Sequence, residues 1–430
     1  MSRAPLRVAV LGAGTVGREV VRALFERADE LTLAAGVPLV VAGVAVRDVD
    51  AARERGLPAD LLTDAPAHLV ASPETDVVVE LMGGDEPART LVSAALGAGK
   101  AVVTANKHVV AHHGPALESA ARRDGGALRY EAAVAGGVPL LGPLASDLAA
   151  NRIDSVRGIL NGTTNYILTA MFDEGRTYEE ALTAAQQAGY AEADPSGDVE
   201  GDDAVNKLVI LARLAFGAWL DPAAVPRRPS RLRGIGGPGI TGVTADELVG
   251  AAALGLTIRL VATAERRPGG GGIAASVLPS AVGADSGLGG TRGVLNRIEV
   301  TGEPIGTVVL SGPGAGGPST SSAVLGDLVA IARGMGSTWA GLPAADLAPA
   351  GLGGIGRDGP TDPVDSASWF AWLPGVRPGR AIEDLAEAHA EVRDGTALRT
   401  LPMPLERIRR AIADVTVPTV DAMIYAIDDR

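Results

Sequence analysis

Lysine is the residue type whose placement in this chain points most directly to chemistry. Only three of the 38 basic residues are lysines, Lys100, Lys107 and Lys207, and the others are arginines. An arginine keeps its proton in a protein, whereas a lysine amine can lose it. Each lysine is therefore a candidate for a task that needs a titratable amine, although chance retention explains Lys100 equally well.

Lys107 and Lys207 both stand in patterned surroundings. Lys107 ends the segment VVTANK, which begins as an apolar, strand-like run, and Lys207 comes one helical turn after Asp203. Side chains at i and i+4 share one face of a helix, so Asp203 and Lys207 are predicted to lie together. An exposed ion pair is worth less than about 1 kcal/mol, so stability alone is a weak reason for keeping a lysine there.

The segment before Lys207 is strongly acidic, with six carboxylates in the twelve positions from Glu192 to Asp203. Some of them can complement the positive end of the following helix. A divalent-metal site is a second interpretation, but no histidine is nearby and the spacing does not fit a calcium loop. A third interpretation is a site for a cationic substrate group, such as a free amine.

A glycine-rich turn near the start of the chain predicts a phosphate-binding site. GAGTVG follows the short apolar run Leu6–Leu11 and precedes a segment with helical spacing. In such a turn the glycines allow a tight bend, close approach of a pyrophosphate and close packing of helix on strand, and the helix amides face the phosphates. A glycine-rich turn without a ligand is the alternative. The predicted dinucleotide-binding residues are Gly12, Gly14, Thr15, Val16 and Gly17.

The end of the second predicted strand bears on the choice of cofactor. Arg47 comes first at this position and Asp48 follows it. A guanidinium can grip a 2′-phosphate through two hydrogen bonds, whereas a carboxylate can accept one from a 2′-hydroxyl. We expect NADP, with NAD possible, and a solvated surface pair is the alternative interpretation.

Composition excludes several classes of function. The net charge is −13, and the chain has no basic run of the kind that nucleic acids attract. No uninterrupted apolar stretch reaches the roughly 18 residues of a membrane span. The N-terminus leads directly into a strand-like run, so a cytoplasmic location is expected. Cysteine is absent, which rules out a thiol nucleophile.

The order of elements predicts an α/β protein. Apolar strands alternating with helices over the first third of the chain are typical of a doubly wound, Rossmann-like parallel sheet. Beyond about residue 147 the pattern is that of a mixed α+β region. Strands are predicted at 6–11, 39–46, 77–81, 101–104, 153–160, 273–278, 294–301 and 307–311, and helices at 18–33, 87–98, 114–123, 165–174, 177–188, 202–215, 245–264 and 319–334.

These elements suggest a division into functional parts. The last part is expected to hold a strand, a helix over 380–392, a helix over 405–413 and a strand over 422–427. The parts are a nucleotide-binding domain (1–146), a substrate-binding, catalytic and dimerisation domain (147–318), a helix returning to the first domain (319–340), a linker rich in Gly and Pro (341–365) and a short C-terminal α+β extension (366–430).

Six segments in this order resemble the homoserine dehydrogenase family, and the resemblance covers roughly residues 5–335. Together they form a specific pattern. The segments are GAGTVG at 12–17, VVTANK at 102–107, YEAAVAGGVP at 130–139, GILNGTTNYIL at 158–168, the acidic stretch at 189–207 and GPGAGGPSTSSAVLGD at 312–327.

The resemblance implies roles for individual residues. In proteins similar to this one, the lysine matching Lys207 donates and accepts the proton on the substrate oxygen, and the one matching Lys107 lies between cofactor and substrate. The residue matching Glu192 binds the substrate amine, and the one matching Asp203 also contacts substrate. Glycines matching Gly189 and Gly316 lie against the cofactor. Backbone carbonyls matching Glu131, Val134, Gly136 and Val138 hold a monovalent cation, for which sodium suits the hard oxygen ligands, and a tight glycine-rich loop is the alternative there.

The implied reaction interconverts L-homoserine and L-aspartate 4-semialdehyde, in threonine, methionine and isoleucine biosynthesis, in a homodimer or higher homo-oligomer. Two other functions fit parts of this pattern. A semialdehyde dehydrogenase working through a thiohemiacetal needs a cysteine, which this chain lacks. A cofactor-binding sensor without turnover has no need for Lys107, Glu192, Asp203 and Lys207. Many family members end in a βαββαβ regulatory domain used for threonine feedback. Two prolines in 396–404 predict a poor hairpin, so a reduced version or a dimer-stabilising extension is expected.

Overall fold

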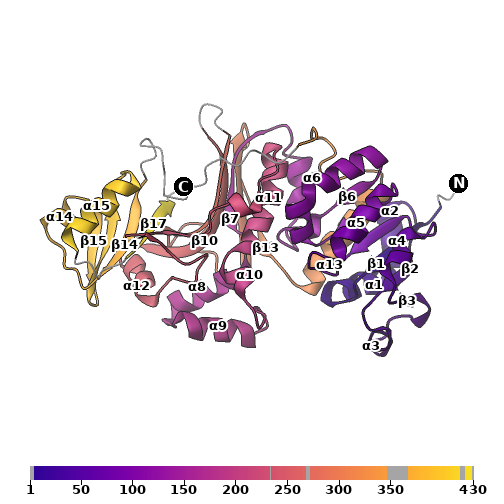
Figure 1. The fold of residues 1–430 in the computed structure, drawn as a ribbon, viewed down its shortest axis with the longest axis horizontal. Helices are drawn as coiled ribbons and strands as arrows, with labels where there is room; N and C mark the ends of the chain where they lie inside the picture. Colours follow the sequence, from indigo (N-terminus) through magenta and orange to yellow (C-terminus); the bar gives the residue numbers. More distant parts are fainter. Residues whose placement is uncertain (1–3, 233, 268–271, 346–366, 417–421, 429–430) are drawn as a thin grey trace.

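The computed structural model describes residues 4–232, 234–267, 272–345, 367–416 and 422–428. Figure 1 shows three parts along the long axis of the molecule. The N-terminal α/β part and the C-terminal α+β part lie at opposite ends, and a tall mixed sheet with its helices lies between them. Within the described ranges, no helix is long and apolar enough to cross a membrane.

The N-terminal part is the predicted doubly wound sheet. Its six strands are all parallel and lie in the order β3-β2-β1-β4-β5-β6. The order reverses between β1 and β4, and ligands of such sheets bind at the carboxyl ends of the strands beside this reversal. The strands are β1 (Leu6–Leu11), β2 (Leu39–Ala45), β3 (Leu62–Thr63), β4 (Val77–Glu80), β5 (Ala101–Thr104) and β6 (Ala127–Arg129).

Helices cover this sheet on both faces, and two of them differ from the prediction. The helix predicted over 18–33 is interrupted at Arg27, so that two helices form, and the helix predicted over 114–123 already begins at Lys107. The earlier start places Lys107 in the first turn of a helix rather than in a loop. The helices are α1 (Thr15–Glu26), α2 (Ala28–Ala35), α3 (Val49–Glu54), α4 (Pro66–Ala71), α5 (Ala88–Gly97) and α6 (Lys107–Asp124).

The middle part is built on a mixed sheet that continues into the C-terminal part. The strand order is β13-β12-β7-β10-β11-β17-β14-β16-β15. In this middle part the strands are β7 (Arg152–Ile159), β10 (Leu256–Arg266), β11 (Ile273–Gly283), β12 (Leu295–Glu303) and β13 (Gly306–Pro313), with the short β8 (Ser230–Arg231) and β9 (Gly234–Ile235), and the helices are α7 (Leu141–Ala145), α8 (Gly162–Glu174), α9 (Tyr178–Gln187), α10 (Ser196–Val199), α11 (Asp202–Phe216) and α12 (Ala245–Ala253).

The helix predicted over 245–264 is wrong in its second half. Helix α12 ends at Ala253, and β10 begins at Leu256 and forms a central strand of the mixed sheet. Gly255 lies between them with a φ of +70°. Glycine adopts this left-handed conformation without strain and is therefore common directly after the end of a helix. Strand β10 is buried on both faces over most of its length, and its residues 256–265 alternate apolar and polar types except at Val261, a strand signal that the prediction missed.

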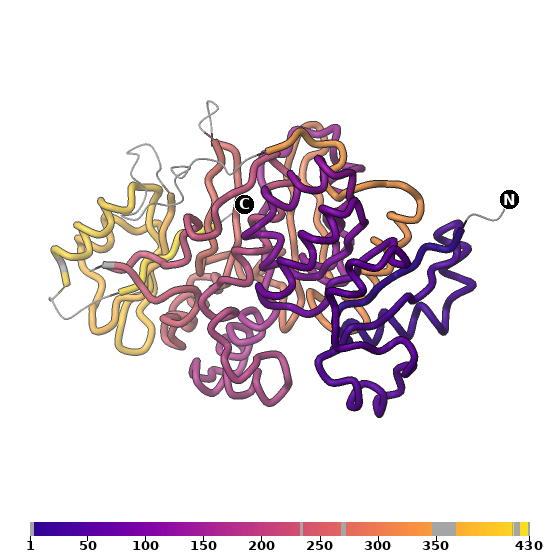
Figure 2. Tube along the Cα trace, turned by 45° about the vertical axis from the view of Figure 1, so that its right-hand side comes forward, coloured from indigo at the N-terminus to yellow at the C-terminus, as the bar shows by residue number. Residues whose placement is uncertain are grey.

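Helix α13 (Gly317–Ala332) leaves the mixed sheet and packs against α1 of the N-terminal part. In Figure 2 the orange segment can be followed from the middle of the molecule back to the indigo and purple chain. The N-terminal part is therefore completed by residues that come late in the sequence.

The C-terminal part holds all six elements of a βαββαβ order. They are β14 (Trp369–Pro374), α14 (Arg380–Glu383), β15 (Ala386–Val392), β16 (Gly395–Thr400), α15 (Leu405–Val415) and β17 (Met423–Asp428). The helix predicted over 380–392 is wrong beyond Glu383, because pairing with β16 holds AEAHAEV extended in spite of its helix-favouring Ala and Glu. The expected reduction of this order is likewise wrong, since the β15–β16 hairpin is present. Most of the predicted linker over 341–365 lies outside the described residues.

Candidate active site

The three glycines of the turn after β1 have different surroundings. Gly12 has a φ of +98°, and a Cβ there would lie 2.8 Å from the carbonyl oxygen of Leu81. A Cβ on Gly17 would lie 2.0 Å from the carbonyl oxygen of Gly12. A Cβ on Gly14 would meet nothing within 4 Å. Gly12 and Gly17 are thus required by the fold itself, whereas Gly14 leaves open space beside the turn.

Two helix N-termini meet beside that open space. Helix α1 starts after Gly14 and helix α13 starts after Gly316, and neither has a side chain that caps its first amides. The two starts touch, since a Cβ on Gly317 would lie 3.0 Å from Cγ2 of Thr15. Uncapped amides and the positive ends of two helix dipoles favour an anion such as a diphosphate. Thr15, Val16 and Gly316 therefore fit the cofactor role predicted for them.

Arg47 and Asp48 follow β2 at the same edge of the sheet. Arg47 is exposed and has no ion pair within the described part of the chain. The carboxylate of Asp48 accepts a hydrogen bond of 2.9 Å from the amide of Ala51, which caps helix α3. Asp48 thus already has a structural partner, and Arg47 remains available to a ligand.

The structure brings Lys107, Asp203 and Lys207 into direct contact. Nζ of Lys107 lies 2.8 Å from Oδ1 of Asp203, and Nζ of Lys207 lies 2.8 Å from Oδ2 of the same carboxylate. Lys107 is the first residue of α6, and Asn106 caps that helix and donates a hydrogen bond to the carbonyl oxygen of Gly84 at 2.8 Å. One carboxylate therefore joins two lysines from two helices.

The two lysines differ in their access to solvent. The side chain of Lys107 is 42% exposed, whereas those of Lys207 and Asp203 are 10% and 8% exposed. Nζ of Lys207 also donates a hydrogen bond of 2.7 Å to the carbonyl oxygen of Leu160, directly after β7. Lys207 is thus buried inside the site, whereas Lys107 is the lysine of the site that reaches solvent.

Charges in the site perturb several pKa values. Asp203 raises the pKa of Lys107, with smaller contributions from Asp198 and Glu192, and this outweighs the lowering by burial. Burial alone would raise the pKa of Asp203, but the two ammonium groups hold it well below its usual range. Burial and the neighbouring Asp203 raise the pKa of Asp198. The site therefore keeps one ionised carboxylate between two amines, which suits proton transfer.

Two residues of this network were not singled out from the sequence. Nδ2 of Asn161 donates hydrogen bonds to Oδ1 of Asp198 at 2.7 Å and to Oδ2 of Asp203 at 2.8 Å. Asn161 lies in the segment GILNGTTNYIL and Asp198 in the acidic stretch, but nothing in either pattern distinguishes them from their neighbours. Helix α8 begins at Gly162, three residues before the predicted start at 165, so the preference of asparagine for helix caps was the signal that could have found Asn161.

Glu192 and Gly189 lie in the exposed loop that follows α9. Within the described part of the chain, the carboxylate of Glu192 has no hydrogen-bond partner, and its charge contributes to the raised pKa of Lys107. The loop is anchored by hydrogen bonds from Gln186 to the carbonyl oxygen of Glu192 (3.0 Å) and from Thr163 to that of Tyr190 (2.7 Å). Glu192 thus lies within electrostatic range of Lys107, and its carboxylate is exposed.

The loop predicted to hold a monovalent cation is tightly folded. The carboxylate of Glu131 accepts hydrogen bonds from the backbone amides of residues 140–142, at donor–acceptor distances of 2.6 to 2.9 Å. It therefore caps α7 and is not free to bind an ion. Gly136 has a φ of +43°, and a Cβ there would lie 2.8 Å from the carbonyl oxygen of Gly314. Within the described ranges, the backbone carbonyls of Val134, Gly136 and Val138 accept no hydrogen bond. These carbonyls fit a cation that is bound by backbone oxygens.

The histidines and Lys100 have structural contacts. Nε2 of His112 lies 3.1 Å from Oδ1 of Asn206, which ties α6 to α11, and His113 pairs with Asp85 at 2.8 Å. The amine of Lys100 donates to the carbonyl oxygens of Val70 and Ser72 at 2.6 and 2.5 Å. In the described part of the chain, no group of three or more His, Cys, Asp or Glu residues could hold a metal ion.

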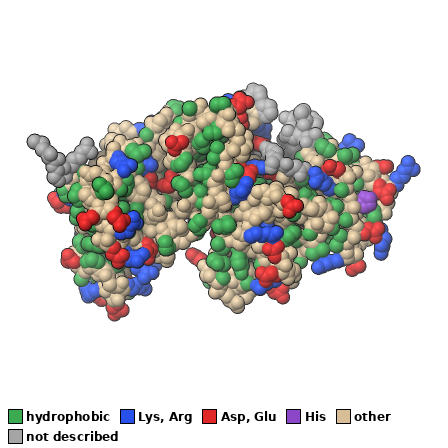
Figure 3. Space-filling model, turned by 180° about the vertical axis from the view of Figure 1, so that it is seen from behind, with side chains coloured by type: hydrophobic (Ala, Val, Ile, Leu, Met, Phe, Trp, Pro, Cys, Tyr) green, Lys and Arg blue, Asp and Glu red, His purple; other side chains and the backbone are tan. Residues whose placement is uncertain are grey.

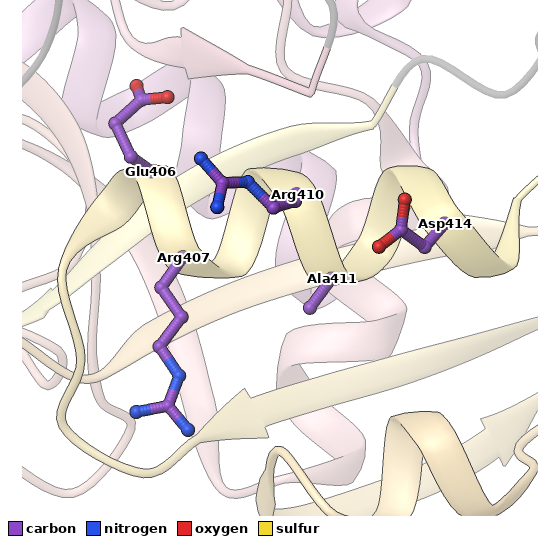
Figure 4. A pocket seen from close by; sticks show the side chains of 5 residues that line it. All are labelled: Glu406, Arg407, Arg410, Ala411 and Asp414. Atoms are coloured by element: carbon purple, nitrogen blue, oxygen red, sulfur yellow. The ribbon is translucent and has the colours of Figure 1, made fainter.

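Two features of the molecular surface can be seen in Figures 3 and 4. Figure 3 shows the molecule from behind, with a notch in its lower outline between the N-terminal part and the helices of the middle part. Figure 4 shows a shallow depression on the outer face of α15, at the other end of the molecule. Its lining residues are Glu406, Arg407, Arg410, Ala411 and Asp414, and none belongs to the site described above.

A parallel six-stranded sheet with a phosphate crevice, facing a cluster of two amines and a carboxylate, defines a nucleotide-dependent oxidoreductase. Comparison with known proteins specifies the family. Models for "Homoserine dehydrogenase, NAD binding domain" and "Homoserine dehydrogenase" match residues 12–131 and 139–329. Homoserine dehydrogenase of Synechocystis is 42% identical over 328 residues, which are 76% of this chain and 73% of the relative. The chain belongs to the homoserine dehydrogenase family of NAD(P)-dependent oxidoreductases.

Two solved structures of homoserine dehydrogenases share this fold. A crystal structure of a homoserine dehydrogenase from Thiobacillus denitrificans has a TM-score of 0.84 and 35% identity, and the match covers 100% of this chain and 99% of that one. A hyperthermophilic archaeal homoserine dehydrogenase in complex with NADPH has a TM-score of 0.62 and 27% identity, over 77% of this chain and 98% of that one. The C-terminal part is covered by the first of these matches.

Proposed function

We propose that this chain catalyses the reversible, NAD(P)-dependent transfer of hydride between L-homoserine and L-aspartate 4-semialdehyde, a step of threonine, methionine and isoleucine biosynthesis. The observation that carries the proposal is the contact of Lys107 and Lys207 with one carboxylate, at 2.8 Å each, in a chain with only three lysines. Family membership supplies the reaction, and this cluster supplies the groups that it needs.

When bound, the nicotinamide ring accepts the hydride from the alcohol carbon or returns it. The proton of the substrate hydroxyl must then be accepted, or in the reverse direction supplied, by a side chain of the protein. In the oxidation direction, neutral Lys207 takes the proton of the substrate hydroxyl, and in the reverse direction its ammonium returns a proton to the same oxygen. The positive charge of Lys107 stabilises the developing negative charge on that oxygen, and Asp203 orients both amines and contacts the substrate.

Glu192 is proposed to bind the amine of the substrate, because its carboxylate is exposed and lies within electrostatic range of Lys107. We assign nucleotide binding to residues 1–146 with the returning helix of 319–340, and substrate binding, catalysis and dimerisation to 147–318. The proposed cofactor contacts are made by Gly12, Gly14, Thr15, Val16, Gly17, Arg47, Lys107, Gly189 and Gly316.

NADP is the proposed preferred cofactor, with NAD as a second one. The support is that Asp48 is occupied as a helix cap while Arg47 is exposed after β2. Arg47→Ala should raise KM for NADP and leave KM for NAD unchanged, and steady-state kinetics with both cofactors measures this. An equal loss with both cofactors would contradict the 2′-phosphate contact.

Sodium is the proposed ion at the backbone carbonyls of Glu131, Val134, Gly136 and Val138, since hard oxygen ligands suit it. A homodimer is proposed because β13 is an edge strand of the mixed sheet and carries exposed Val309, with exposed Leu295 and Ile305 beside it. Sedimentation of wild type and Val309→Lys tests the dimer. A cytoplasmic location is also proposed.

The decisive experiment follows formation of reduced cofactor from NADP and homoserine, by absorbance. Lys207→Ala should lower turnover by a factor of about 100 to 10,000, the usual loss for a general acid–base group, and leave NADPH affinity unchanged. Lys100→Ala is the matched control, because that amine contacts only backbone carbonyls of 70 and 72 in the described chain, and its turnover should stay normal. Full activity of Lys207→Ala would overturn the mechanism, whereas cofactor binding without turnover in wild type would favour a sensor.

A further inference from the structure

Asn161 lies between the end of β7 and the start of α8, and its side chain faces α10 and α11. Its side chain is buried, with the residue 4% exposed. A single amide nitrogen, Nδ2, donates to Oδ1 of Asp198 at 2.7 Å and to Oδ2 of Asp203 at 2.8 Å. Two carboxylates from α10 and α11 are therefore held together by one neutral side chain.

The opposite end of the Asn161 side chain fixes its orientation. Oδ1 accepts hydrogen bonds from the backbone amide of Thr164 at 2.8 Å and from its hydroxyl at 2.9 Å, as the cap of helix α8. Turning the amide over would place Oδ1 against two carboxylates and the NH2 group against a helix amide. The rest of the fold thus forces the two N–H groups to face Asp198 and Asp203.

Leu160 and Asn161 contact the two members of the Lys207–Asp203 ion pair. The carbonyl oxygen of Leu160 accepts from Nζ of Lys207 at 2.7 Å, and Oδ2 of Asp203 accepts from both Lys207 and Asn161. Oδ1 of Asp203 is left for Lys107. The carboxylate cannot rotate without losing at least one of these contacts.

We propose that Asn161 is a positioning residue of the acid–base centre, which keeps the carboxylate of Asp203 aimed at Lys207 and holds Asp198 beside it. The inference rests on the proposed function, because it presumes that Lys207 moves the proton. Asn161 acts through Asp203 and is not itself placed against substrate.

The charges around Asn161 explain why an amide is suited to this place. Asp198 and Asp203 face it from α10 and α11, and Lys207 and Lys107 face Asp203 from α11 and α6. Burial and Asp203 raise the pKa of Asp198, and the hydrogen bond from Asn161 opposes that rise. A donor between two carboxylates lets both stay ionised, whereas a third carboxylate there would need a shared proton.

The test compares two substitutions that both retain a helix cap, Asn161→Asp and Asn161→Ser. Asn161→Asp keeps the shape, removes both donated hydrogen bonds and adds a negative charge. We expect kcat/KM for homoserine to fall about 100-fold, as for other small misplacements of catalytic groups, and the acidic limb of the pH profile to move up by about one unit or more. Asn161→Ser should lose less activity, about 10-fold, with little shift of the limb, and NADPH affinity should be unchanged in both.

Asn165→Ser is the matched control. Asn165 is also a buried asparagine of α8, but its amide donates to the carbonyl oxygens of Thr291 and Gly293, outside the site. This variant should keep the wild-type pH profile. If Asn161→Asp fails to fold, Asn161→Ser alone decides, because its activity must fall while that of Asn165→Ser does not.

The outcomes separate the two levels of the proposal. A wild-type kcat/KM and pH profile in both Asn161 variants, together with an inactive Lys207→Ala, would overturn the role of Asn161 and leave the proposed function standing. Wild-type turnover of Lys207→Ala would overturn the function itself. Equal losses in Asn161→Asp and Asn161→Ser, without any shift of the pH profile, would contradict the positioning role, because the charge that aspartate adds would then have no effect on the acid–base centre.

Discussion

Replacing Asp203 by asparagine probes the centre of the site with almost no change of shape. The carboxylate contacts Lys107 and Lys207 at 2.8 Å each and is 8% exposed. Asparagine removes the negative charge and leaves two positive charges facing each other. We expect both the stability and the chemistry of the protein to change, each in a direction that the structure fixes.

The magnitude follows from the distances and the burial. Each ion pair at 2.8 Å has a Coulomb ceiling of about 6 kcal/mol at an effective dielectric constant of about 20. Removing one member of a buried pair typically costs about 3–5 kcal/mol. Because the Lys107 side chain is 42% exposed, water screens its share. We therefore expect Asp203→Asn to lower the free energy of unfolding by about 3 kcal/mol near neutral pH, measured by urea titration.

The pH dependence has a definite sign. The pKa of Asp203 is lowered by folding, so its stabilisation is present above the unfolded value of about 4 and is lost as the pH falls through the folded value. The pKa of Lys107 is raised, so its share is present below about 10 and is lost as the pH rises through the folded value. The stability difference between wild type and Asp203→Asn should be largest between about pH 5 and 9 and should shrink outside that window.

The kinetic result should follow the same charges. Without Asp203 the pKa of Lys107 falls, and turnover should drop by about 100-fold or more, with the limb that reports the amines moved to lower pH. Asp202→Asn is the control, because Asp202 is the next residue toward the N-terminus but pairs with Arg227 outside the site. Asp203→Asn with the stability, turnover and pH profile of wild type would refute the reasoning.

Three further substitutions test the glycine-rich turn after β1 and the packing of α6 against α11. Gly14→Ala should unfold like wild type in urea, because the added methyl group meets no protein atom within 4 Å. It should raise KM for NADP at least about 10-fold, because that methyl group enters the open space beside the turn. An unchanged KM would remove Gly14 from the cofactor site. Gly17→Ala should lose more than about 3 kcal/mol of stability, because its Cβ would lie 2.0 Å from the carbonyl oxygen of Gly12, and normal stability would contradict the packing. Glu118→Gln should lower the free energy of unfolding in urea by about 3–5 kcal/mol, because Glu118 accepts hydrogen bonds of 2.8 and 3.0 Å from the fully buried Arg213. The pH profile of turnover should stay that of wild type. A loss of stability below about 1 kcal/mol would show that water replaces the pair.

The first third of the chain could be predicted well because its signals are local. Strand β1, the glycine turn and the start of α1 adjoin one another in sequence, and the unbroken apolar runs of β2, β4 and β5 are typical of strands buried on both faces. Glycines 12 and 17 are demanded by contacts with residues near them in the turn or in the neighbouring strand. Such positions can be recognised from spacing alone.

The errors occurred where strand pairing overrode helix-favouring residue types. Residues 256–266 became β10 because β7 and β11 flank them, and residues 386–392 became β15 because β16 pairs with them. Both segments contain residues that are compatible with a helix, but apolar and polar residues also alternate over 256–265 and 386–392, with one exception at Val261. That alternation was a local strand signal that the prediction missed, whereas the strands that pair with each segment were decided by the tertiary structure.

The sequence by itself determined which groups could act: three lysines, an acidic stretch, an i,i+4 pair at Asp203 and Lys207, and a dinucleotide turn. Only the tertiary structure decided that Lys107 joins that pair, that Asn161 bridges Asp198 and Asp203, and that the start of α13 returns to the start of α1. The physical reason is that residue types and short spacings act along the chain, whereas a catalytic contact depends on which helix ends the two sheets bring face to face.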